Sequence, residues 1–429
     1  MGYSVGIIGG GAAGLTAAIA AAGRGAQVTL IERNDRPGKK LLATGNGKCN
    51  LGNENLSLDK YYTGHPDFLE GCLKRFGTAE TKAFFTGIGL MLKSKNGYLY
   101  PVSEQASAVL DVLRYEAKAL EVTFVTGCKA EEIEISPGDR KCVRGGGEIF
   151  SFDRVILACG GSAAPKTGSD GSGYLLAQRL GHSIIPTVPA LVQLKCRENY
   201  LKSVSGVRTD ALVTVLRRGK VQARERGELQ LTDYGVSGIP VFQLSRVVNY
   251  ILKEEREVEL VIDFLPDETR ESFETVCGDR AFLQKNRTVE EFFTGMLHKK
   301  LMMLFIRLAG LKATEPVAAA DRKKVRRVYE LCRHWKLQVT GSNSYDNAQV
   351  CAGGVPLDEL TEQLESKKAS GIYLAGEMLD VDGKCGGYNL QWAWCSGYLA
   401  GSAAAGDDRR MEKDMRENEG TDSCSESIR

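Results

Sequence analysis

Three glycines near the start of the sequence have the spacing that dinucleotide binding requires. Gly9, Gly11 and Gly14 form a G-x-G-x-x-G pattern directly after the apolar residues 5–8. In this pattern the first glycine permits a tight turn, the second lets the backbone approach a pyrophosphate, and the third lets a helix pack closely against the strand. The alanine-rich segment that follows is expected to be a helix whose first N–H groups point at the phosphates.

An acidic residue completes this pattern. Glu32 closes a second apolar strand about 20 residues beyond the glycines, where a carboxylate accepts hydrogen bonds from the ribose hydroxyls of an adenosine. A glycine-rich turn that only packs would explain the glycines but not Glu32. We therefore predict a dinucleotide site. Ala12, Ala13 and Arg33, which stand next to the glycines and to Glu32, are further candidate contacts of the cofactor.

Composition limits the class of protein. The chain has 429 residues, 43% hydrophobic and 26% charged, with a net charge of +2. These values are typical of a globular protein with two or three domains, and the charge gives no overall attraction to nucleic acid or membrane. No apolar stretch is long enough to span a bilayer. The twelve cysteines form no C-x-x-C pair, so we expect no metal site and a location in the reducing cytoplasm.

The types of secondary structure expected along the chain change twice. Residues 1–190 mix βα units with glycine turns, and residues 345–406 show the same mixture. Between them, 191–262 show short alternating β segments and 267–337 are expected to be helical. We predict an α/β fold, with a Rossmann-type domain (1–190 and 345–406) split by an inserted β-plus-helical domain (191–344). Residues 407–429 are expected to be a flexible polar tail.

Three further glycine clusters could contact a cofactor. The first, residues 44–50, could form an anion nest or touch a flat ring, although a plain surface loop explains it equally well. The second follows the apolar strand 155–158. The third has Gly376, Glu377 and Asp380 at a strand end, which suits a polyol, and a helix expected to start near Gly387. The positive end of a helix suits a ring that gains negative charge on reduction, so FAD fits better than NAD.

These stretches resemble a known family over nearly the whole chain. The matching segments include VGIIGGGAAGL, KLLATGNGKCNLGN, YPVSEQA, ILACGGSAAPKTGSDGSGY, LTDYGVSGIP and GIYLAGEMLDVDGKCGGYNLQWAWCSGYLAG. The sequence is similar to the BaiN/YhiN-like, or aminoacetone-oxidase-like, FAD-binding flavoproteins. The resemblance implies a Rossmann-type domain whose insert has a β-barrel-like part and a helical part, and it implies non-covalent FAD.

The candidate FAD contacts beyond the first pattern combine the clusters with this resemblance. They are Lys40, Thr44, Gly45, Asn46, Gly47, Lys48, Cys49, Asn50, Cys159, Gly160, Gly161, Gly376, Glu377, Asp380, Gly387, Tyr388, Asn389 and Gln391. Three positions depart from the family pattern. Lys48 replaces an arginine, Asp233 stands where a histidine is frequent, and Tyr98 replaces another arginine. The departures lie where a substrate could bind.

The expected reaction follows from the flavin. FAD can pass two electrons to a carbon–carbon double bond. A second G-x-G-x-x-G pattern and a redox cysteine pair are both missing from the sequence, which argues against a dedicated NAD(P)H domain and against disulfide reduction. The resemblance implies reduction of unsaturated steroid acids or of uridine in ribosomal RNA. We expect a reductase of an unsaturated small molecule with NAD(P)H as donor. The alternatives are an RNA-modifying flavoenzyme and a flavin redox sensor without turnover.

Candidates for proton transfer are few. Asp233, Tyr234 and Ser237 lie on a glycine-containing loop of the insert, and Tyr388 lies at the expected helix start. His182 and His334 are expected to be structural. RNA binding would need a basic surface, and the densest basic cluster lies in residues 322–327, for which a solvated helix face is the preferred interpretation. The residues carry no signal for an oligomeric state.

Overall fold

The computed structural model describes residues 2–273 and 286–406. The predicted polar tail, 407–429, lies outside the described residues. The chain divides into two compact units. The split unit comprises Met1–Thr187 and Val350–Arg429, and the inserted unit comprises Val188–Gln349.

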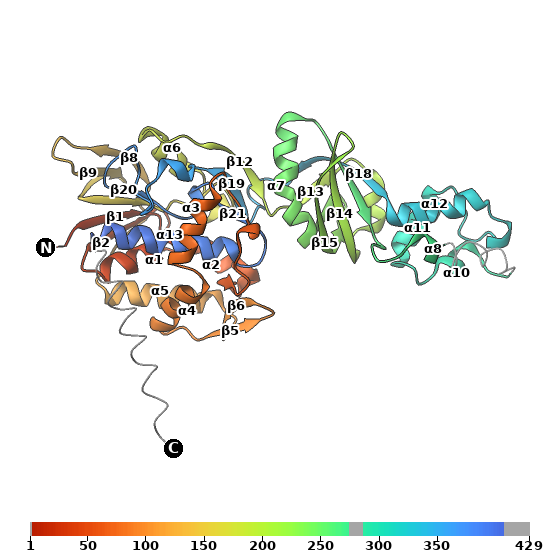
Figure 1. Cartoon of the computed structure of the whole chain (residues 1–429), viewed down its shortest axis with the longest axis horizontal. Helices are drawn as coiled ribbons and strands as arrows, with labels where there is room; N and C mark the ends of the chain where they lie inside the picture. Colours follow the sequence, from red (N-terminus) through yellow and green to blue (C-terminus); the bar gives the residue numbers. More distant parts are fainter. Residues whose placement is uncertain (1, 274–285, 407–429) are drawn as a thin grey trace, which may run out of the picture. The chain divides into compact units, whose positions relative to one another are not determined.

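A parallel five-stranded sheet forms the centre of the split unit, with the strand order β20-β11-β1-β2-β7. Figure 1 labels β20, β1 and β2 of this sheet. Each neighbouring pair runs parallel, so the connections must cross over the sheet. The strands are short and mostly buried, as the apolar runs require. Their bounds are β1 Ser4–Ile8, β2 Gln27–Glu32, β7 Thr123–Thr126, β11 Arg154–Leu157 and β20 Ile372–Leu374.

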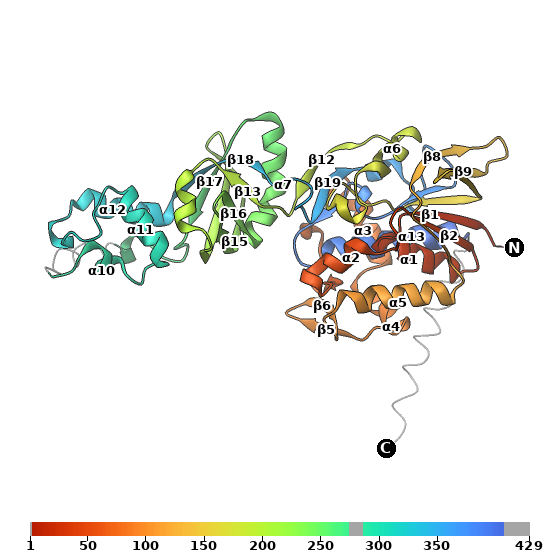
Figure 2. The same cartoon turned by 180° about the vertical axis from the view of Figure 1, so that it is seen from behind.

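Two helices pack against this sheet side by side (Figures 1 and 2). They are α1, Ala12–Ala22, and α13, Tyr388–Ala404. A Cβ on Gly397 would lie 2.4 Å from the carbonyl oxygen of Ala13, and a Cβ on Gly401 would lie 2.3 Å from that of Ala17. The two backbones are therefore in direct contact, and the matching four-residue steps show that the helices run parallel.

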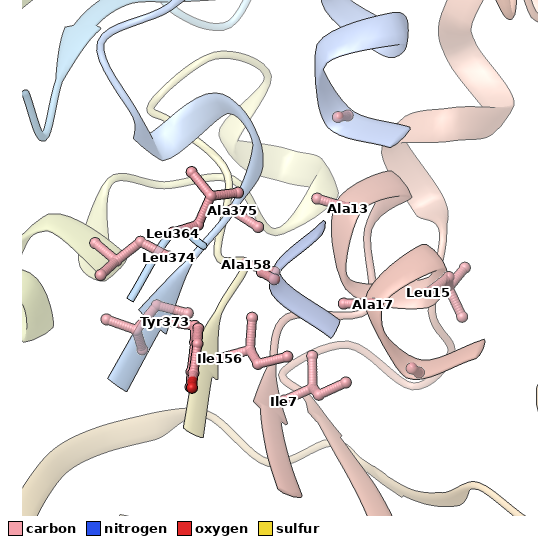
Figure 3. Packing of buried hydrophobic residues seen from close by; sticks show 14 of the residues in the cluster. Ile7, Ala13, Leu15, Ala17, Ile156, Ala158, Leu364, Tyr373, Leu374 and Ala375 are labelled. Carbon is pink, nitrogen blue, oxygen red and sulfur yellow. The ribbon is translucent and has the colours of Figure 1, made fainter. Parts of the chain in front are cut away.

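The helix α1 covers the sheet with alanine side chains. Figure 3 shows Ala13 and Ala17 of α1 in one cluster with Ile7 of β1 and Ile156 of β11. All four side chains are buried. Such close layering brings the first turn of α1 directly over the end of β1, where the glycine pattern lies.

The remaining elements of the split unit surround this core. The helices are α2 Lys39–Ala43, α3 Pro66–Arg75, α4 Thr78–Gly87, α5 Ala106–Ala119 and α6 Ser172–Arg179. The small sheets are formed by β3 Gly52–Asn53, β5 Leu92–Lys95 and β6 Tyr98–Pro101, by β4 Tyr61–Tyr62 and β21 Asp382–Gly383, and by β8 Ala130–Ile135, β9 Lys141–Gly145 and β10 Glu148–Phe152. A further pair is formed by β19 Val350–Gly354 and by β12 Ile185–Ala190, a strand that begins in the split unit and ends in the inserted unit.

The inserted unit is a closed six-stranded barrel with helices (Figure 2). Alternate residues of its strands are buried, as in Val258, Leu260 and Ile262, because successive side chains point to opposite faces. The strands are β13 Leu194–Cys196, β14 Arg208–Arg217, β15 Lys220–Leu231, β16 Gly235–Gly238, β17 Val258–Asp263 and β18 Trp335–Ser342. The helices are α7 Ile239–Glu254, α8 Arg270–Phe273, α10 Val289–Phe293, α11 Lys299–Leu308 and α12 Arg322–Arg333.

The predicted fold class, a Rossmann-type domain split by a barrel-like and helical insert, is confirmed. One element was missed. The segment 191–262 was expected to contain only β segments, yet α7 lies within it. Pro240 stands in its first turn, where proline favours helix initiation, and an apolar face follows. Within the described ranges, no helix is long and apolar enough to cross a membrane.

A buried histidine holds two distant segments of the split unit together. His182 is 4% exposed and lies after α6. Its Nδ1 is 2.7 Å from Oε2 of Glu359, and its Nε2 is 2.7 Å from Oγ of Ser366. Ser366 Oγ already accepts the backbone N–H groups of two following residues, so its hydroxyl hydrogen donates to Nε2, and Nδ1–H donates to Glu359. Ser366 is buried, which makes this network structural.

The same network predicts a dependence of stability on pH. Burial raises the pKa of Glu359, but hydrogen bonds from Ser183 and His182 outweigh it and hold the pKa below its ordinary value. A lowered carboxyl pKa stabilises the fold above the unfolded pKa, about 4.3, and this stability is lost as the pH falls through the folded pKa. We expect Glu359→Gln to cost about 1–3 kcal/mol at pH 7 and progressively less as the pH is lowered from about 4.3 through the folded pKa of Glu359. Urea unfolding at pH 7 and at a series of pH values down to about 2.5, with Glu362→Gln as the exposed control, tests this. A cost of Glu359→Gln that stays the same from pH 7 to the lowest pH would contradict it.

Candidate cofactor and active site

The glycine turn has the geometry that a pyrophosphate site needs. Gly9 has a φ of +104°, which favours glycine, and a Cβ on Gly14 would lie 1.8 Å from the carbonyl oxygen of Gly9. A Cβ on Gly11, by contrast, would meet nothing within 4 Å. Gly9 and Gly14 therefore serve the turn and the helix packing, whereas Gly11 borders open space at the start of α1. No side chain caps this helix start, so its N–H groups are available to an anion.

Glu32 ties the end of β2 to this turn. Its side chain is buried, and Oε2 accepts the backbone N–H of Gly10 at 2.8 Å. Oε1 accepts the backbone and side-chain N–H groups of Asn34 at 2.8 and 2.7 Å. Each carboxylate oxygen can accept more than one hydrogen bond, so Oε2 keeps capacity for a ribose hydroxyl. The neighbouring Arg33 forms an ion pair with Asp170.

This arrangement predicts that Glu32→Ala weakens FAD retention. The substitution removes a ribose acceptor and leaves the N–H of Gly10 without its partner, so we expect about a tenfold loss of FAD affinity, since hydrogen bonds to charged groups contribute about 1.5–3 kcal/mol. The absorbance ratio at 450 and 280 nm after dialysis measures retention. Glu131→Ala, at an exposed position of β8, is the control. Full flavin occupancy in the Glu32 variant would disprove the assigned role.

Segments far apart in the sequence meet beside the glycine turn. Lys40 Nζ lies 2.6 Å from Oε2 of Glu377, whose Oε1 accepts the backbone N–H of Cys351 at 2.9 Å. A Cβ on Gly161 would lie 3.3 Å from the carboxyl carbon of Glu377, and a Cβ on Gly376 would lie 2.9 Å from Cβ of Ala13. The predicted positions Lys40, Gly161, Gly376 and Glu377 thus form one region with the start of α1.

The loop 44–50 has an unusual backbone. Gly45, Asn46, Gly47 and Cys49 all have positive φ angles, between 54° and 83°. Successive N–H groups in such a loop can form a concave anion site, and residues 45–48 are exposed. Burial raises the pKa of the Cys49 thiol to about 12, so it stays protonated at neutral pH and is a poor redox thiol.

Asn50 joins this loop to the start of α13. Its amide nitrogen is oriented toward the carbonyl oxygens of Gly52 and Leu99 at 2.8 and 3.2 Å, and its oxygen lies 3.3 Å from the backbone nitrogen of Gly387. Gly387 has a φ of +91°, and a Cβ there would lie 2.6 Å from the carbonyl oxygen of Gly52. Only glycine therefore fits this close approach.

Several predicted contacts use their side chains within the protein. Asn389 exchanges two hydrogen bonds with the backbone of Gly383, at 2.8 and 2.7 Å. Gln391 donates to the carbonyl oxygen of Gly77 and to Thr81 Oγ1. Asp380 accepts the backbone N–H of Gly64 at 3.3 Å. These bonds shape the start of α13, and the predicted contacts of the three side chains with FAD stay predictions.

The two parallel helices present two positive ends to the same side of the sheet. The helix α1 begins one residue before Ala13, and α13 begins nine residues before Gly397, which faces Ala13. At 1.5 Å per residue, α13 starts about 12 Å further out than α1. One extended molecule can therefore place its pyrophosphate at α1 and a ring that gains negative charge at α13. This is the layout that FAD requires.

A polar hollow lies next to the start of α13. It is lined by Lys48, Lys95, Asn96, Tyr98, Tyr100 and Glu104. A Cβ on Gly386 would lie 3.2 Å from the ring of Tyr98 and 2.9 Å from that of Tyr388, which places the hollow beside this helix start. Of the lining residues, only Lys48 was a predicted contact. The alternation in 98–101, which puts Tyr98 and Tyr100 on one face of β6, was the available signal.

The predicted catalytic residues are divided between the two units. Tyr388 is in the split unit, where its side chain is 5% exposed and its hydroxyl donates to the carbonyl oxygen of Asn55 at 3.3 Å. Asp233 and Tyr234 belong to the inserted unit. Tyr234 is partly exposed and accepts a hydrogen bond from Asn343 Nδ2 at 3.2 Å. Their catalytic role stays a prediction.

The parallel sheet, the glycine turn at the start of α1 and the acid at the end of β2 define a Rossmann-type FAD-binding oxidoreductase. The chain belongs to the family described as HI0933-like protein Rossmann domain, which matches residues 3–403. The predicted resemblance is thereby confirmed.

Individual proteins are also similar to this chain. It is 46% identical over 408 residues to the 3-dehydro-bile acid delta(4,6)-reductase of Clostridium scindens, covering 94% of this chain and 98% of that protein. It is 30% identical over 399 residues to the ribosomal RNA dihydrouridine synthase of Haemophilus influenzae, covering 91% and 96%. Among solved structures, the 3-ketosteroid delta1-dehydrogenase of Sterolibacterium denitrificans aligns with a TM-score of 0.49 at 13% identity, covering 94% and 99%.

Proposed function

We propose that this protein is an FAD-dependent reductase that saturates a carbon–carbon double bond of a steroid acid enone, with NAD(P)H as electron donor. The observation that carries the proposal is the 46% identity, over nearly the full length of both chains, to a reductase of a 3-dehydro-bile acid. The polar hollow beside the start of α13 supplies a place for such a substrate.

The residues of the split unit fit the cofactor. Open space at Gly11 and the uncapped start of α1 would hold the pyrophosphate, and Glu32 would hold the adenosine ribose. When bound there, FAD would supply hydride transfer between the nicotinamide donor and the enone. The positive end of α13 would stabilise negative charge beside it by up to ~2 kcal/mol.

A proton must also reach the substrate. Burial is the main cause that raises the pKa of Tyr100, and the adjacent Tyr98 adds to it. The phenol of Tyr100 therefore stays protonated at neutral pH and holds a proton at the wall of the hollow. We add Tyr100 to the proposed donors Tyr234, Asp233 and Tyr388. Tyr388 is the weakest of these, because its hydroxyl already donates to Asn55.

Anaerobic mixing tests the proposal. NADPH or NADH should bleach the flavin absorbance at 450 nm, and a 3-oxo-4-ene steroid acid should restore it, with a product two mass units heavier than the enone. A flavin that stays oxidised in the presence of both donors would indicate a sensor without turnover. Reoxidation by a uridine-containing ribosomal RNA fragment, and not by the enone, would favour the alternative reaction.

The RNA alternative has one structural observation in its favour. The helix α12 exposes a basic face, formed by Arg322, Lys323, Lys324, Arg326 and Arg327. A basic helix face is more often a solvated surface than a nucleic-acid site, and the identity to the dihydrouridine synthase is lower. We also propose a cytoplasmic location, where the ten cysteines of the described ranges would remain the free thiols that they are here.

A further inference from the structure

The hollow beside α13 has an excess of positive charge. Its lining contains two lysines and one carboxylate, together with two tyrosines and Asn96. Glu104 pairs with Lys48 at 2.7 Å and also with Lys93 at 2.7 Å, so two ammonium groups share one carboxylate. Lys95 makes no ion pair with any residue that the structure describes. The region thus has more cations than its own carboxylate can balance.

Two aromatic rings provide the apolar part of the same hollow. Tyr98 and Tyr100 lie on one face of β6, and Tyr98 is 39% exposed, so its ring is accessible to a bound molecule. Strand β6 is hydrogen-bonded to β3, where Asn53 faces Tyr98 and donates to the carbonyl oxygen of Gly386 at 3.1 Å. The rings are therefore fixed relative to the start of α13.

We propose that this hollow binds the carboxylate end of a substrate with a flat apolar body, with Lys95 as the residue that recognises the negative charge. The proposal rests on the proposed function, because the start of α13 is taken as the place of the reactive ring. Tyr98 and Tyr100 contact the apolar body, and Lys48 is the second lysine of the lining. The substrate is thereby selected as a free acid and not as an uncharged ester.

Binding of an unreactive probe pair tests this subsite without turnover. Isothermal titration of the FAD-loaded protein with cholate and with cholate methyl ester compares two steroids with the same ring system, one with a free carboxylate and one in which a methyl ester removes the charge. An exposed ion pair contributes up to about 1 kcal/mol, so we expect the acid to bind about fivefold more tightly than the ester. Raising the salt concentration should reduce this preference, since the pair is exposed to solvent.

Three variants separate the subsite from general effects of charge. Lys95→Met should weaken cholate binding about fivefold and leave the ester unchanged. Glu104→Gln should strengthen cholate binding, because Lys48 and Lys93 lose their shared partner. Lys118→Met, at an exposed position of α5, removes the same charge away from the hollow and should change neither.

Contrary results identify which idea fails. Equal binding of acid and ester by a protein that reduces the enone would overturn the subsite and leave the proposed function standing. A protein that binds FAD but shows no enone reduction would overturn the proposed function instead. If Lys95→Met weakens NADP⁺ binding and not cholate binding, the positive charge serves a nucleotide phosphate, and the carboxylate subsite is wrong.

Discussion

A Gly11→Val protein should fold like the wild type and lose FAD affinity by at least about a hundredfold, or about 2.7 kcal/mol. A Cβ at Gly11 meets no atom within 4 Å, and the residue has an extended backbone, with φ of −80° and ψ of −166°, that valine also adopts. The added side chain would instead occupy the space at the start of α1 that the pyrophosphate needs.

Gly14→Val provides the contrast to this variant. A Cβ there would lie 1.8 Å from the carbonyl oxygen of Gly9, so the turn and α1 cannot both keep their positions. We expect this second variant to be poorly folded. The thermal midpoint of the FAD-free proteins and a fluorescence titration with FAD distinguish the two effects. Normal FAD binding by Gly11→Val would show that the pyrophosphate lies elsewhere.

The second large effect is expected at the contact between α1 and α13. Gly397→Leu would force a side chain into the backbone of Ala13, which lies 2.4 Å from the ideal Cβ position. Leucine is a good helix former, so the cost comes from packing, and we expect a loss of about 3 kcal/mol in the free energy of unfolding. FAD retention should fall too, because the helix starts would shift.

Gly71→Ala is the matched control for this experiment. Gly71 is a helical glycine of α3 whose Cβ would meet no atom within 4 Å. Alanine there should stabilise the protein by about 0.5–1 kcal/mol. Urea unfolding of both variants compares the two sites. A Gly397→Leu protein as stable as Gly71→Ala would disprove the direct contact between the helix backbones.

The parts of the fold that follow from local rules could be predicted from the sequence. Gly9, Gly14 and Glu32 are constrained by a turn, a close helix and a buried acceptor, and each constraint depends on neighbours at fixed spacing. The barrel strands likewise follow from alternation. The helix α7 was missed because its apolar residues were assigned to the surrounding β segments.

The hollow could not be predicted in the same way. Lys95, Tyr100 and Glu104 come together because β3, β5 and β6 pair, and pairing depends on the whole unit. The hydrogen-bond partners of the amide side chains could not be predicted from the sequence either. Asn389 and Gln391 stand at suitable positions, yet their amides bond to the backbone and to Thr81.

The parallel contact of α1 with α13 has a consequence for biosynthesis. The first of these helices ends at Ala22 and the second at Ala404, so a ribosome must translate the whole segment between them, the barrel included, before the two can meet. A nascent chain can form the glycine turn early, but it lacks the surface that receives the ring. Coenzyme capture should therefore be a late event, completed after the barrel has been synthesised.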